Sequence, residues 1–77
     1  MENELVEKLA KEIAQLKNKK EILNEIEWFL QGHYTKCRFL TMLIMNNLYR
    51  PEYYLLSEKL ANRELLLKLY NLILDKS

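Results

Sequence analysis

Two side chains in the sequence could carry out nucleophilic or acid–base chemistry near neutral pH: the only histidine and the only cysteine. His33 and Cys37 are four residues apart, near the expected start of a helix whose dipole would favour a thiolate. A Cys–His dyad also needs an orienting group and an oxyanion site, and no motif in the sequence supplies them. We therefore expect no enzyme, a loop position for His33 and a small buried thiol at Cys37.

The same pair is also too small to hold a metal ion. A structural zinc site takes about four ligands, and one chain offers two here. A dimer could complete a Cys₂His₂ site across its two-fold axis, which is the alternative. We expect no metal site and no cofactor, and a structural role for Cys37.

Cations and tyrosines alternate in the middle of the chain, where "LYRPEYY" places three tyrosines around one arginine. The possible basic contacts of this segment are Lys36, Arg38 and Arg50. Aromatic rings among cations can stack on bases and hold phosphates, so a dimeric nucleic-acid-binding regulator is the alternative function. The whole chain carries a net charge of only +1, which argues against a nucleic-acid partner. We interpret the tyrosines as packed rings at one end of a bundle.

Size and composition predict an all-α fold. The chain has 77 residues, 49% hydrophobic and 30% charged, with one glycine and one proline. This composition is too apolar for a disordered chain and too poor in turn-forming residues for a β-sandwich, so we expect a single helical domain over residues 1–77. The acidic N-terminus lacks the basic start of a signal peptide, and the uncharged run 39–49 is shorter than the ~20 residues of a membrane span. We expect no membrane span and a cytoplasmic location.

The glycine and the proline divide the chain into three predicted helices, at about 3–30, 35–48 and 51–75. Gly32 fits a left-handed helix end, Thr35 an N-cap and Pro51 a first helical turn. The fold is then a small bundle of three helices, or of four if the last segment breaks near Asn62, which could cap a separate helix. Within the first segment, leucines recur every seven residues, at Leu9, Leu16, Leu23 and Leu30.

The last segment carries more apolar surface than one chain is expected to bury. Its first stripe contains Leu56, Leu60, Leu67 and Leu74, which we assign to the intrachain core. The remaining apolar positions are assigned to a partner: Leu65, Leu66, Leu69, Leu72 and Ile73. Extended apolar patches mark association sites, so we expect association through helix faces with a protein partner, with a second copy, or with both.

The predicted function is therefore that of a small helical protein–protein interaction module, such as a co-chaperone, an inhibitor or an adaptor. The segment "PEYYLLSEKLANRELLLKLYNLIL" resembles the helical hairpin of small type III secretion needle co-chaperones. That resemblance rests on a leucine-rich pattern over the last part of the chain and on no diagnostic residue. It therefore names no family for this protein.

Overall fold

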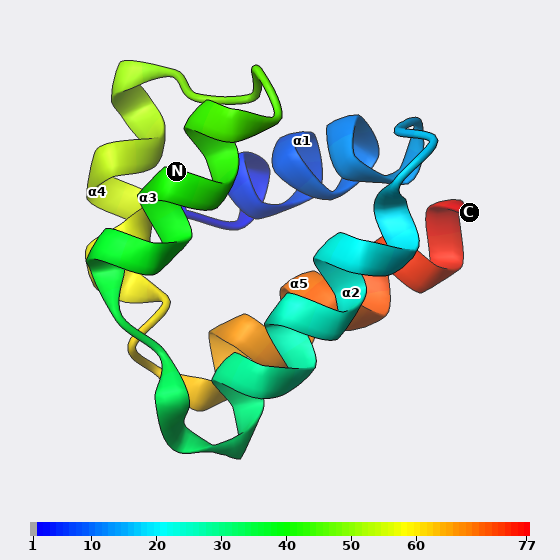
Figure 1. Ribbon diagram of the computed structural model, residues 1–77. Helices are drawn as coiled ribbons and strands as arrows, with labels where there is room; N and C mark the ends of the chain where they lie inside the picture. The colour runs from blue at the N-terminus through cyan, green and yellow to red at the C-terminus, as the bar shows by residue number, and fades with distance from the viewer. Residues whose placement is uncertain (1) are drawn as a thin grey trace.

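The computed structural model describes residues 2–77, and within this range the protein is all-helical with no strand. Its five α-helices and one π-helical turn are α1 (Glu2–Ala14), α2 (Lys19–Trp28), η1 (Phe29–His33), α3 (Lys36–Met45), α4 (Pro51–Lys59) and α5 (Arg63–Lys76). The predicted all-α class is confirmed, whereas the predicted count of three or four helices is wrong (Figure 1). None of the helices between residues 2 and 77 is long and apolar enough to cross a lipid bilayer.

The first predicted helix, 3–30, is broken into α1 and α2 by a turn at residues 15–18. The amides of Gln15 and Leu16 donate to carbonyls three residues back, at 3.3 and 3.0 Å, which tightens and ends α1. Leu16 still packs against the core, although it is no longer helical. The seven-residue leucine pattern therefore continues through the turn. For this reason the pattern gives no sign that the helix is interrupted.

The other helix ends follow the predicted local signals. Gly32 has φ of 103°, the left-handed region that favours glycine. The Thr35 hydroxyl accepts a hydrogen bond from a first-turn amide at 3.1 Å, and Pro51 occupies the first turn of α4. The break near Asn62 is also confirmed, because its side chain caps α5 by accepting from a first-turn amide at 2.9 Å.

Helix α3 ends three residues before the predicted position 48, in a Schellman motif. Asn47 takes the left-handed conformation, with φ of 59°. The amide of Leu48 donates to the carbonyl of Leu43 at 2.8 Å, and the amide of Asn47 donates to that of Ile44 at 3.1 Å. Leu48 is buried, so this cap also fixes the direction in which the chain leaves α3.

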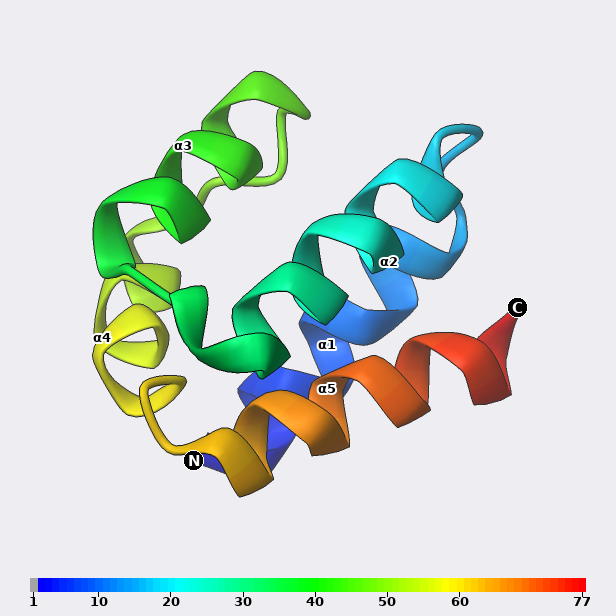
Figure 2. The same cartoon turned by 60° about the horizontal axis from the view of Figure 1, so that its bottom comes forward.

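The helices form two groups. Helices α1, α2 and α5 pack together, with the most extensive contact between α1 and α5, while α3 and α4 form a hairpin that joins them through α1 and α4. Figures 1 and 2 show the hairpin beside the α1–α2–α5 group, with α3 set apart from α2. The buried apolar core runs through both groups and comprises Val6, Leu9, Ala10, Ile13, Ile22, Ile26, Phe29, Phe39, Met42, Leu43, Leu48, Tyr53, Leu56, Leu60, Leu66, Leu69 and Ile73.

The two stripes of α5 are the reverse of the sequence-based assignment. Leu66, Leu69 and Ile73, predicted as partner contacts, are buried, with at most 1% of their surface exposed. Leu67 and Leu74, predicted as core, are 37% and 47% exposed. The other two predicted partner contacts, Leu65 and Leu72, are partly buried against the core. The helical periodicity of the sequence groups apolar residues into stripes, but it does not tell which stripe faces the core. In the structure that choice is set by α1 and α2, which both pack on α5.

Candidate functional site: the groove between α2 and α3

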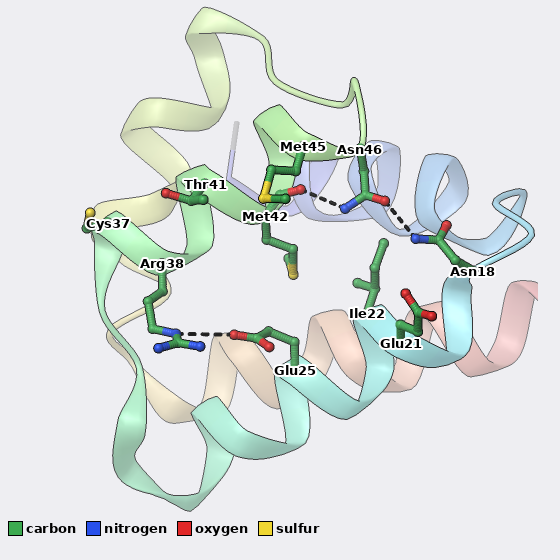
Figure 3. Close-up of a pocket in the computed structure, with 10 residues that line it drawn as sticks. All are labelled: Asn18, Glu21, Ile22, Glu25, Cys37, Arg38, Thr41, Met42, Met45 and Asn46. Carbon is green, nitrogen blue, oxygen red and sulfur yellow. Dashed lines mark hydrogen bonds and ion pairs between the residues drawn. The ribbon is translucent and has the colours of Figure 1, made fainter.

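A groove of about 510 Å³ lies between α2 and α3 and is the candidate functional site. It is lined by Asn18, Glu21, Ile22, Glu25, Cys37, Arg38, Thr41, Met42, Met45 and Asn46 (Figure 3). The residues from α2 recur every three or four positions, and so do those from α3, because one face of each helix is turned to the groove.

Apolar side chains line the inner part of the groove and continue onto its outer edge. Ile22 from α2 and Met42 from α3 are buried, at 2% and 9% exposure. Met45 lines the groove and is 77% exposed, and the adjacent Ile44 is 59% exposed. Helix α3 is therefore only partly buried. Its buried residues are Phe39, Met42 and Leu43, whereas its last two residues, Ile44 and Met45, are exposed.

Two polar bridges span the groove, one toward each end. Arg38 Nε lies 3.3 Å from Glu25 Oε2, and Asn18 Nδ2 donates to Asn46 Oδ1 at 2.8 Å (Figure 3). The amide nitrogen of Asn46 also donates to the carbonyl of Met42 at 2.8 Å, which fixes its orientation. These bridges link α2 and α3 across the groove.

The predicted basic contacts do not form one patch, because each contacts a different helix. Arg38 pairs with α2, as described. Lys36 Nζ lies 3.2 Å from the Tyr54 hydroxyl and 3.3 Å from Glu58 Oε2, both on α4. These hydrogen bonds, first to Tyr54 and then to Glu58, raise the pKa of Lys36. Lys36 therefore serves to pair α3 with α4.

Arg50 joins the hairpin to α1. Its guanidinium lies 2.9 Å from Glu12 Oε2, and the Tyr53 hydroxyl donates to Glu12 Oε1 at 2.8 Å. The hydrogen bond to Glu12 raises the pKa of Arg50. The predicted aromatic–basic cluster is thus partly structural, with Tyr53 buried and Arg50 paired.

The sequence reasoning missed the lysines in the α1–α2 turn and at the start of α2. Lys17, Lys19 and Lys20 make no ion pair with any residue of the described range 2–77, whereas the predicted cations are all paired. The run "KNKK" is the available signal, but a single predicted helix over 3–30 places it in mid-helix. These lysines adjoin Asn18 but do not line the groove.

His33 and Cys37 make separate contacts. The His33 ring stacks on Trp28, with centroids 3.8 Å apart. Cys37 is exposed and lines the groove, so the prediction of a buried thiol is wrong. Between residues 2 and 77 no three His, Cys, Asp or Glu side chains gather in a way that could hold a metal ion.

The groove thus combines the apolar side chains of Ile22, Met42 and Met45 with polar and charged ones. Comparison with known proteins adds no relative: no protein-family model, no curated protein and no solved structure matches this chain.

Proposed function

We propose that this protein is a binding module that holds apolar side chains of a protein partner in the groove between α2 and α3. The observation that carries the proposal is the exposed end of α3. Its last two residues, Ile44 and Met45, are 59% and 77% exposed, and Met45 lines the same groove as the buried Ile22 and Met42. Two adjacent large apolar side chains left in water next to an apolar groove mark an association surface.

The chemistry of the lining supports this choice. Methionine is flexible and polarizable, and it is frequent on surfaces that accommodate apolar side chains of varied shape. A volume of about 510 Å³ accepts a few such side chains, and an amphipathic helix presents them in a row along a groove of this kind. A protein that binds a partner in this way, without catalysing a reaction, would act as a co-chaperone, an inhibitor or an adaptor.

Nucleic-acid binding has weaker support. Lys36, Arg38 and Arg50 are each engaged with a carboxylate of their own chain, so binding phosphates with them would break intrachain pairs. The two functions separate in a gel shift with mixed-sequence DNA at low salt, where a salt-dependent complex would support the regulator and its absence would remove it.

The test of the protein-binding function is capture of the partner from the native cell with the tagged chain and with two matched variants. Met45→Glu places a charge at the groove, and Leu67→Glu places one on the outer face of α5, where Leu67 is 37% exposed. We expect Met45→Glu to lose the partner and Leu67→Glu to retain it, with equal helicity by circular dichroism. Loss of the partner with Leu67→Glu alone would move the site to α5.

A further inference from the structure

We propose that the occupant of this groove is a second copy of the chain, bound through an antiparallel, two-fold contact between the α3 helices. The inference rests on the proposed function, because it names the partner for the same surface. It is carried by two features: the symmetric spacing of the exposed α3 side chains and the placement of unlike charges along the groove.

The spacing on α3 is self-complementary. Cys37, Thr41 and Met45 all line the groove and recur at intervals of four, so they form one uncharged line along the helix. A two-fold axis beside Thr41 sets α3 antiparallel to its copy. It then brings each Cys37 against Met45 of the other copy, and the two Thr41 side chains meet at the axis. An isologous contact of this kind needs only one self-complementary surface.

The charges agree with the same axis. The two bridges, Asn18–Asn46 and Glu25–Arg38, show that α2 and α3 are antiparallel across the groove. Glu21 lies on α2 between Asn18 and Glu25. Along the groove it is therefore closer to Asn46 than Arg38 is. Glu21 makes no ion pair with any described residue, and the Arg38 side chain is 61% exposed despite its contact with Glu25. Rotation about the axis at Thr41 places Arg38 of each copy opposite Glu21 of the other, which gives two unlike-charge contacts.

A second copy is the occupant that uses all of these groups at once. The groove supplies an acid without a partner, an exposed cation and an uncharged line of side chains, and each finds its complement on the same chain. The low net charge of +1 also leaves little overall repulsion between two copies.

The decisive experiment is a charge exchange followed by sedimentation equilibrium. The wild-type chain should pass from one-chain to two-chain mass between low and high micromolar concentration. Glu21→Arg alone sets like charges at both contacts, as does Arg38→Glu alone, and each should raise the dissociation constant by at least about fivefold. An equimolar mixture of the two variants has unlike charges at both contacts, so it should form the two-chain species again as a mixed dimer.

A cross-link locates the axis. Thr41→Cys in a Cys37→Ser background should form a disulfide-linked dimer on mild oxidation, because a disulfide requires Cα atoms within about 7 Å. The control, Asn71→Cys in the same background, places the thiol on the exposed side of α5 and should form no disulfide-linked dimer.

The inference and the proposed function fail separately. A wild-type chain that stays monomeric at high micromolar concentration, or a mixture that behaves like the single variants, overturns the second copy as occupant. If Met45→Glu still releases a captured cellular protein in that case, the groove binds a different protein and the proposed function stands. If the chain dimerises but the Asn71→Cys variant cross-links instead of the Thr41→Cys variant, the dimer uses α5 and the inference is wrong.

Discussion

Two pairs of helices in this protein, α1 with α5 and α2 with α3, are built differently. Between α1 and α5 the facing residues are apolar and closed to water: Ile13, Leu69 and Ile73 are all 0% exposed. Between α2 and α3 the direct links are polar, at 3.3 Å for Arg38–Glu25 and 2.8 Å for Asn18–Asn46, and apolar side chains remain open between them.

This difference separates stability from binding. Burial of large aliphatic side chains stabilises the fold by about 1.5–3 kcal/mol each, whereas exposed polar bridges contribute little beyond geometry. The α1–α5 side therefore holds the fold, and the α2–α3 side can present the exposed Met45, which the fold does not need. Substitutions on the two sides should behave accordingly.

The largest expected effect is on α5, where two leucines make a matched pair. Leu69→Ala should lower the free energy of unfolding by about 2–5 kcal/mol, because Leu69 is 0% exposed and its loss leaves a cavity. Leu67→Ala should cost less than about 1 kcal/mol, since Leu67 is 37% exposed. Urea unfolding at a concentration that keeps the chain monomeric measures both. Equal losses in the free energy of unfolding for the two variants would mean that Leu69 does not face the core.

That pair also shows what the sequence could and could not predict. Apolar periodicity placed Leu67 and Leu69 on different stripes of one helix, which is correct. It could not tell which stripe faces inward, because direction depends on the neighbours that α5 meets. Those neighbours are α1 and α2, and the turn between them is the feature that the leucine pattern concealed.

The helix ends were predictable for a physical reason. Gly32, Thr35, Pro51 and Asn62 act through their own backbone or side chain within a few residues, so local sequence is sufficient. The groove is a different case. Its residues come from segments about twenty positions apart, and only the tertiary arrangement of α2 and α3 brings them together.

The second largest effect should appear at alkaline pH and should come from Tyr34, just before α3, and Tyr53 of α4. Burial raises the pKa of both Tyr34 and Tyr53, and the Tyr53 hydroxyl is further held by Glu12. In the unfolded chain these phenols ionise near pH 10, so the unfolded state loses protons that the folded state keeps. Stability should therefore be intact below about pH 10 and fall as pH rises above it.

The measurement is urea unfolding across that range, with tyrosinate absorbance recorded in parallel. The double variant Tyr34→Phe with Tyr53→Phe should show a flatter decline, because the raised pKa values are removed. A tyrosine that is ionised in the unfolded state and protonated in the folded state lowers the free energy of unfolding by at most about 1.4 kcal/mol per pH unit. An unchanged slope in the double variant would show that other groups govern alkaline unfolding.

A smaller effect is expected at the junction that joins the two groups of helices. Glu12 accepts from Arg50 at 2.9 Å and from Tyr53 at 2.8 Å, with its side chain 22% exposed. Glu12→Gln keeps the shape but loses the charge, so we expect a loss of about 1 kcal/mol. A double-mutant cycle that combines Glu12→Gln with Tyr53→Phe should give a coupling energy above zero. Strict additivity would mean that the Tyr53–Glu12 hydrogen bond does not help to attach the hairpin.

The smallest expected effect is that of Cys37→Ser, and it tests the groove side directly. Cys37 is exposed, so exchanging its thiol for a hydroxyl buries no polar group in the monomer. At low concentration the free energy of unfolding should therefore change by less than about 0.5 kcal/mol, and purified protein should carry no stoichiometric zinc before or after the change. At high concentration the proposed dimer covers this position with Met45 of the other copy, and the thiol should then react more slowly with iodoacetamide. A loss above about 1 kcal/mol at low concentration would instead mean that α2 and α3 close over Cys37 in solution, and the contrast between the two sides would disappear.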